Sequence, residues 1–293
     1  MLASVLVLVW PAAPAHAAVG VRTTRAIEFA ASAAPGVLTW TQAPRSRPNA
    51  FRALAKIGSR SPVRLNARGT RGFVSSGAVD EPGNRIAYWQ HRGTKGNIKI
   101  FNVDSGRRRS VFVNTAAHEW GASVSGKRLL FARGRYGAPM RLYVANLQTR
   151  NVRRVARVDS GIFLEPGDLS GRWVTWTRCA GFRNCSIIRL NVRTGNRKVL
   201  GNPRDRSQFG ASVLPSGQVF YGESRNYDTC ASALRLFKAR RQGGRAHLDT
   251  LPSGTSIGGT SVRRVSSSRV HVYYDRYRCS TGAWDIYRIR ARA

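Results

Sequence analysis

Short apolar runs alternate with turn-forming residues and polar loops along most of the chain. A Gly or Ser turn precedes an apolar–aromatic run, and a polar loop then leads to a second apolar run and a basic strand. Runs of this length are typical of β-strands, and no segment shows a long 3.6-residue periodicity, so helices should be scarce. The first run occurs six times, at residues 37–40, 86–89, 129–131, 173–176, 219–221 and 270–274.

The second run follows at a similar offset in each unit. It occupies residues 98–101, 142–144, 187–190, 234–237 and 285–289, and a weaker segment at 51–57 takes its place in the first unit. Hairpin turns come next, at 104–106, 149–151, 194–196 and 243–244. Their Gly and Asn residues tolerate the positive φ that tight hairpins require.

The units repeat with a nearly constant period. The glycines that precede the first five runs are 47, 43, 45 and 46 residues apart, at Gly36, Gly83, Gly126, Gly171 and Gly217. Six such units of four short strands predict an all-β fold, a six-bladed β-propeller of four-stranded antiparallel blades. A β-sandwich pair gives no reason for six similar units, and a β-helix needs shorter coils.

The last unit reaches only its third strand before the chain ends at residue 293. Residues 19–23 are expected to supply the missing outer strand and to close the ring. A closed ring hides the sheet edges that would otherwise pair with other chains.

Residues 1–17 have the features of an export signal. An apolar run at 2–10 is followed by Pro11 and Pro14, and the small–x–small pattern at 15–17 suits cleavage. No Lys or Arg precedes the run, so the true start of the chain stays open. We expect residues 18–293 to form a single propeller domain of an exported protein, extracellular or in the cell envelope. No later segment is apolar enough over about 20 residues to be transmembrane.

The net charge of +35 comes from 49 basic and 14 acidic residues. Such a charge attracts anionic surfaces and polymers at low salt, whatever the fold. The expected partner is an anionic polymer or an acidic protein, whereas nucleic acid would bind nonspecifically. A structural propeller whose charge reflects genome composition is the alternative that the sequence leaves open.

Arginines and aromatic residues recur in the loops between the first and second runs. In a propeller these loops gather on one face, where guanidinium groups could grip carboxylates or phosphates and aromatic rings could stack on bases or sugars. For any single arginine, the abundance of arginine in the chain is the better explanation, whereas for the collective surface the two explanations are equal. The candidate ligand-binding residues are Arg92, Arg133, Arg135, Tyr136, Arg178, Arg183, Arg225, Tyr227, Arg276 and Arg278.

The four cysteines lie in the same set of loops. An even number in an exported chain favours disulfides, and the spacings contain no Cys-x-x-Cys pair that would suit zinc. Four cysteines allow three connectivities. Cys179 and Cys185 share one loop, while Cys230 and Cys279 occupy corresponding loops of neighbouring units, so we expect these two pairs.

Catalytic motifs are scarce. The stretch 254–258 matches a nucleophile elbow, but a turn entering a strand surrounds it instead of a strand and a helix. Histidines are scattered over different units, and Glu119, Glu165 and Asp168 are expected to stabilise turns or to pair with arginines. No phosphate loop, EF-hand loop or HExxH motif occurs. The sequence therefore predicts neither a catalytic residue nor a metal site or cofactor.

The repeats resemble those of TolB-like propellers. Residues 124–127, 169–172 and 214–217 are degenerate versions of that family's Ser-Pro-Asp-Gly turn, and Asp285-Ile286-Tyr287 matches its second element. The resemblance covers residues 30–290 and implies a propeller fold and a docking role in the cell envelope. We expect a non-catalytic, monomeric binding or scaffold propeller that engages an anionic partner through its loops. The alternative is a polysaccharide lyase or hydrolase acting at the channel mouth.

Overall fold

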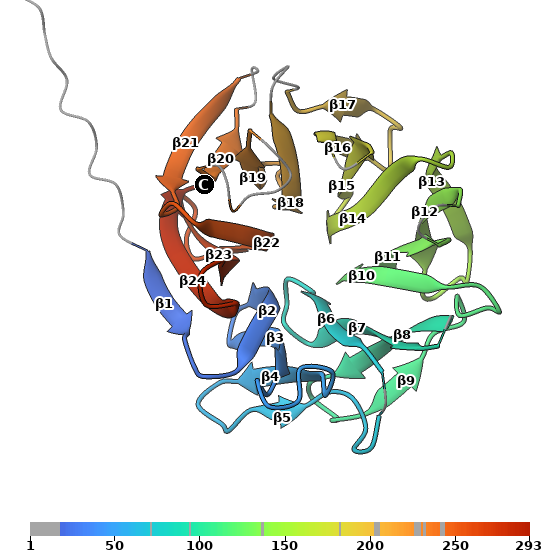
Figure 1. Cartoon of the computed structure of the whole chain (residues 1–293). Helices are drawn as coiled ribbons and strands as arrows, with labels where there is room; N and C mark the ends of the chain where they lie inside the picture. The colour runs from blue at the N-terminus through green and yellow to red at the C-terminus, as the bar shows by residue number, and fades with distance from the viewer. Residues whose placement is uncertain are drawn as a thin grey trace, which may run out of the picture.

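The chain forms a ring of six four-stranded antiparallel sheets around a central channel (Figure 1). The computed structural model describes residues 18–70, 72–93, 95–135, 138–181, 183–201, 206–225, 230, 233–240 and 244–293. All its regular elements are strands, so the predicted six-bladed β-propeller is confirmed. Within the described ranges no helix is long and apolar enough to cross a membrane.

The first three blades follow one another along the chain. Blade 1 contains β2 (Ile27–Ala34), β3 (Val37–Ala43), β4 (Arg52–Ile57) and β5 (Val63–Arg64). Blade 2 contains β6 (Val74–Val79), β7 (Arg85–Arg92), β8 (Lys95–Asn102) and β9 (Arg108–Ser110). Blade 3 contains β10 (Glu119–Ser125), β11 (Arg128–Arg133), β12 (Met140–Asn146) and β13 (Val152–Val158).

The remaining three blades complete the ring. Blade 4 contains β14 (Ile162–Ser170), β15 (Trp173–Ala180), β16 (Arg183–Asn191) and β17 (Arg197–Val199). Blade 5 contains β18 (Ser207–Val213), β19 (Val219–Ser224), β20 (Arg235–Ala239) and β21 (Arg245–Thr250). Blade 6 contains β22 (Thr255–Arg264), β23 (Arg269–Arg278) and β24 (Ala283–Arg292), with β1 (Val19–Arg22) as its outer strand.

The outer strand of blade 6 comes from the start of the described chain. β1 runs antiparallel to β24, with Val19 opposite Arg288 and Gly20 opposite Tyr287. The sheet of blade 6 therefore has β1 at one edge and β22 at the other.

The innermost strand of each blade was not predicted from the apolar runs of the sequence. The six apolar–aromatic runs are the second strands, whereas β2, β6, β10, β14, β18 and β22 lie nearest the axis (Figure 1). About half of the residues in these inner strands are Ser, Gly or Ala. Their low apolar content hid them from a search for apolar runs.

Each inner strand carries a β-bulge at the same position. The bulges cover residues 30–31, 77–78, 121–122, 167–168, 210–211 and 258–259. Glycine is required at Gly121, which has a φ of +62° and whose added Cβ would lie 2.5 Å from Cγ of Pro166. A bulge bends its strand and redirects the side chains that follow, and here all six bulges meet around the channel.

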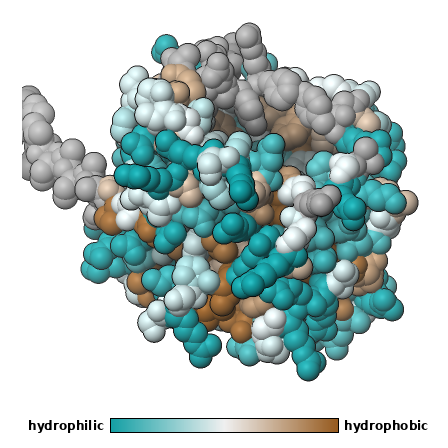
Figure 2. Space-filling view, turned by 60° about the horizontal axis from the view of Figure 1, so that its bottom comes forward, coloured by the Kyte–Doolittle hydropathy of each residue, from teal (hydrophilic) through white to brown (hydrophobic). Residues whose placement is uncertain are grey.

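One apolar cluster fills each of the six interfaces between neighbouring blades. The interface of blades 3 and 4 buries Leu142 and Trp176, for example, and that of blades 6 and 1 buries Trp40 and Ile286. No blade has a complete core by itself, which explains why the units must pack in a ring. The side of the molecule in Figure 2 is mostly hydrophilic, with small hydrophobic areas between polar side chains.

Two disulfides lie on one face of the ring, and Cys179 and Cys185 are opposite residues of paired strands. Cys179–Cys185 joins β15 to β16 within blade 4, and Cys230–Cys279 joins blade 5 to blade 6. These are the two pairs that the loop positions favoured. The second bridge spans a sequence separation of 49 residues, so it ties two blades together.

Candidate functional site

A cavity of about 300 Å³ lies in the channel toward the end where the inner strands begin. We call this end the upper face, because the loops between second and third strands lie there; the short hairpin turns lie on the lower face. The cavity is lined by the bulges and by residues from all six blades. Four of its lining residues are large aromatics: Phe29, Trp89, Trp120 and Trp284.

Three of these rings, those of Phe29, Trp89 and Trp284, belong to a continuous aromatic band that crosses four blades. Neighbouring ring centroids along the band are 4.8 to 6.2 Å apart, within the range of favourable aromatic contacts. In order, the band contains Tyr277, Trp284, Phe29, Phe73, Trp89, His118 and His91. Its members are all half-buried, so each presents part of its ring to the solvent.

A further aromatic contact continues the wall beyond the band. The rings of Trp120 in blade 3 and Phe163 in blade 4 stack at 6.3 Å with an interplanar angle of 24°. Trp120 itself lines the cavity. Aromatic surface therefore extends from blade 6 through blades 1, 2 and 3 to blade 4.

Three carboxyl groups lie in the wall of this cavity, those of Glu165, Asp168 and Asp275. Burial and the charge of Asp275 raise the pKa of Glu165 to about 7, and burial raises that of Asp275 to about 6. Backbone N–H groups of Ala30 and Ala31 oppose the shift of Asp275 by favouring its charged form. The Oδ1 atom of Asp275 is buried without a hydrogen-bond partner among the described residues. At neutral pH the cavity thus holds a carboxyl that can exchange a proton.

The carboxylate of Asp168 makes hydrogen bonds within the protein. Oδ1 of Asp168 accepts hydrogen bonds from Oγ of Ser123 and from the backbone N–H of Leu169, and Oδ2 accepts one from the N–H of Val213. These contacts join blades 3, 4 and 5 beside the channel. Asp168 therefore stabilises the inner ring, whereas Glu165 makes no ion pair within the described ranges.

A histidine pair ends the aromatic band. The rings of His91 and His118 lie 4.8 Å apart, and burial together with the neighbouring His91 lowers the pKa of His118. No group of three or more His, Cys, Asp or Glu suited to a metal occurs in the described part of the chain. Ser256 of the elbow-like stretch lies within strand β22, so the match has no elbow geometry.

Four of the candidate arginines are exposed on the upper face, at or just beyond the ends of second strands. They form what we call the arginine rim: Arg92, Arg135, Arg178 and Arg225. Among described residues, no ion pair engages any of them. Their guanidinium groups are available to a partner.

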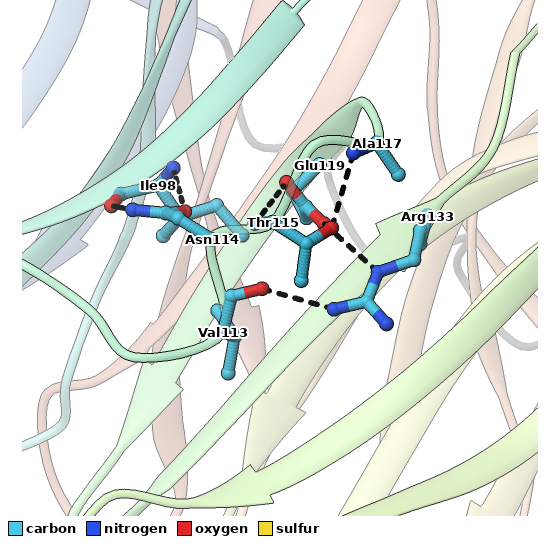
Figure 3. Close-up of polar contacts among 7 residues, drawn as sticks. All are labelled: Ile98, Val113, Asn114, Thr115, Ala117, Glu119 and Arg133. Carbon is cyan, nitrogen blue, oxygen red and sulfur yellow. Dashed lines mark hydrogen bonds and ion pairs between the residues drawn. The ribbon is translucent and has the colours of Figure 1, made fainter.

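Arg133 has a different role, as Figure 3 shows. Its Nε donates to Oε1 of Glu119 at 2.8 Å, and its Nη2 donates to the carbonyl of Val113 at 2.9 Å. Glu119, which has no exposed side-chain surface, also accepts a 2.6 Å hydrogen bond from Oγ1 of Thr115. Arg133 is thus the counter-ion of a buried carboxylate.

The two candidate arginines of blade 6 are also engaged within the protein. Nη2 of Arg278 lies 2.7 Å from Oδ2 of buried Asp285, although nearly half of the arginine side chain is exposed. Arg276 stacks on the ring of Tyr287 and donates a hydrogen bond to its hydroxyl. The sequence could not distinguish these residues from those of the rim, because all six occupy similar strand ends.

The remaining candidates lie wholly or partly outside the described structure. Tyr136 and Tyr227 are outside the described residues. Arg183 begins β16, and its side chain is not described.

Comparison with known proteins supports the fold. No protein-family model matches the chain, and no curated protein matches it in sequence. Among solved structures, the putative TolB of Agrobacterium tumefaciens aligns with a TM-score of 0.60 at 16% identity, covering 92% of this chain and 91% of that one. TolB from Acinetobacter baumannii gives 0.59 at 16% identity, covering 87% and 64%. The chain therefore shares the β-propeller fold of these two TolB structures.

An oligogalacturonate lyase in complex with manganese also shares the fold. Its TM-score is 0.56 at 11% identity, covering 88% of this chain and 76% of that one. At such identities the likeness shows the propeller architecture alone, and the chemistry must be argued from the residues of this chain.

The residues that line the cavity were not among the sequence candidates. A search for small residues instead of apolar runs could have found them, because Trp120 and Pro166 each stand directly before the glycine of a bulge. The glycine recurs at 77, 121, 167, 210 and 258, once in each of five blades. That pattern marks the inner strands of the propeller and the residues beside its channel.

Proposed function

We propose that this propeller is an exported, non-catalytic binding protein that takes an acidic polysaccharide into the upper end of its channel. The observation that supports this proposal most directly is the aromatic band, three of whose rings line the cavity, with the arginine rim on the same face. Sugar rings stack on aromatic faces, and guanidinium groups bind carboxylates with paired hydrogen bonds. The two disulfides accord with export, because such bridges persist in oxidising compartments.

Other anionic partners fit the cavity less well. An acidic protein could contact the arginine rim, but a polypeptide needs no long aromatic wall. Nucleic acid would use both features, and the net charge of +35 would attract it at low salt. Binding of a polyuronate at moderate salt, in competition with single-stranded DNA, separates these partners.

The test is a calorimetric titration with a uronic-acid oligosaccharide and a neutral oligosaccharide of equal length. We expect the acidic oligosaccharide alone to bind. A rim variant in which Arg92, Arg135 and Arg178 become Gln should lose about tenfold in affinity, since exposed charges govern attraction to an oppositely charged ligand. The matched control changes Arg107, Arg193 and Arg240 to Gln on the lower face, removing the same charge, and should bind as the wild type does. Equal losses in both variants would contradict a specific site.

Glu165 favours one alternative, a lyase or hydrolase acting in the same cavity. A carboxyl with a pKa of about 7 can serve as general acid or base near neutral pH. If the wild type shortens the acidic oligosaccharide and Glu165→Gln does not, the protein is an enzyme. Binding without shortening supports the non-catalytic function.

A further inference from the structure

A second cavity, of about 540 Å³, lies on the lower face between blades 2 and 3. We call it the lower groove. Four basic residues and one aromatic residue line it together with apolar and neutral polar groups: Arg85, Arg109, Lys127, Arg150 and Phe112. None of the described residues in its wall is Asp or Glu. The groove is therefore cationic throughout and separate from the cavity on the upper face.

Arg150 occupies a backbone position that glycine fills elsewhere. Three hairpin turns share one pattern, at 102–107, 146–151 and 191–196, and each starts with an Asn whose N–H bonds to the carbonyl of the sixth residue. The fifth residue is Gly106 in blade 2 and Gly195 in blade 4, with φ of +65° and +78°. In blade 3 it is Arg150, with φ of +62°, a conformation that costs energy for any residue with a Cβ.

The side chain of Arg150 lines the groove. Its guanidinium carbon lies 5.4 Å from the ring centroid of Phe112, so the arginine stacks on the aromatic wall. Strained backbone persists where the surroundings or a function require it, and the inference runs from the observed conformation to the function. A glycine here would relieve the strain and remove the guanidinium from the groove.

The cationic groups of the groove are not equally free. Nη1 of Arg85 donates to the carbonyl of Gly126 at 2.9 Å, and this contact holds blade 2 to blade 3. In the described part of the chain, no ion pair involves Arg109, Lys127 or Arg150. Three cationic groups therefore face one groove without an anion.

We propose that the lower groove binds a phosphate-bearing ligand. A phosphoryl group offers three acceptor oxygens to three cationic groups, whereas a carboxylate offers two. Arginine binds such oxygens in a paired geometry, and lysine binds them as a point charge. This site uses none of the residues of the upper cavity, so it does not depend on the function proposed for that cavity.

The experiment is a calorimetric titration of the full protein with inorganic pyrophosphate, compared with citrate. We expect pyrophosphate to bind at least about tenfold more tightly than citrate, as paired contacts to phosphoryl oxygens require. Arg150→Gly should lose about tenfold in pyrophosphate affinity or more, with a melting temperature equal to or above that of the wild type. Lys127→Gln should weaken binding as well.

The matched control is Arg193→Gln, which removes one exposed charge from the equivalent turn of blade 4. It should leave pyrophosphate affinity unchanged. Equal losses in Arg150→Gly and Arg193→Gln would reduce the effect to net charge and overturn the proposal. Undetectable pyrophosphate binding, or citrate binding as tightly, would overturn it too.

Discussion

Nε of Arg133 donates a 2.8 Å hydrogen bond to Oε1 of Glu119, whose side chain is completely buried. A residue that the sequence assigned to ligand binding thus neutralises a carboxylate inside the protein. The ion pair lies just below the upper face and fixes the start of β10 against the end of β11. Its contribution should therefore appear in stability and not in ligand affinity.

Replacing Arg133 with Ala should destabilise the protein by about 2–4 kcal/mol, because the substitution leaves a buried charge without its partner. Denaturant unfolding monitored at pH 7 measures the change. Arg135→Ala, which removes a neighbouring exposed arginine, should stay within about 0.5 kcal/mol of the wild type. Similar stabilities for the two variants would show that Glu119 does not need its counter-ion.

The two disulfides should differ in their contribution to stability. Loss of Cys230–Cys279 by substitution with Ser should cost about 4 kcal/mol, and loss of Cys179–Cys185 about 2 kcal/mol, because a longer closed loop restricts the unfolded chain more. The sequence separations are 49 and 6 residues. Thermal unfolding of the two double-Ser variants tests the order. The reverse order would contradict the entropic explanation.

The sequence predicted the number of blades and the cysteine pairs, since both depend on spacing along the chain. It missed the inner strands, because residues such as Gly167 and Ser123 carry no apolar signal. It also could not tell Arg133 from Arg135. Which arginine meets a buried carboxylate depends on strand register and on packing between blades, and neither follows from local composition.

Glu165 should make the protein less stable as the pH rises. Its pKa is about 7 in the folded state, above the ordinary value of 4.5, so between these values the unfolded chain loses the proton first. The stabilisation is present at pH 4 and disappears as the pH passes 7. The melting temperatures of the wild type and Glu165→Gln are measured from pH 4 to pH 8. The melting temperature of the variant should exceed that of the wild type by the largest margin at pH 8. A constant difference would contradict the raised pKa.

The bulge glycines should resist substitution more than turn glycines do. In Gly121→Ala, the residue has a left-handed φ of +62° and its new Cβ would lie 2.5 Å from Cγ of Pro166. In Gly126→Ala, φ is +53° and the new Cβ would have no atom within 4 Å. We expect a loss of about 1–2 kcal/mol for Gly126→Ala from backbone strain alone. Gly121→Ala should lose about 1–3 kcal/mol more through overpacking beside the channel. Equal losses from chemical unfolding would show that the bulges can adjust.

The most direct test of the proposed function is tryptophan emission during a titration with a uronic-acid oligosaccharide. Trp89, Trp120 and Trp284 all line the upper cavity, so a bound sugar chain must change their surroundings. We predict a saturable change in emission whose apparent affinity falls between 50 and 200 mM salt (about the range over which exposed charges become screened) and which weakens in Trp120→Ala. Calorimetric binding without any change in emission, or no binding at the lower salt concentration, would contradict the account.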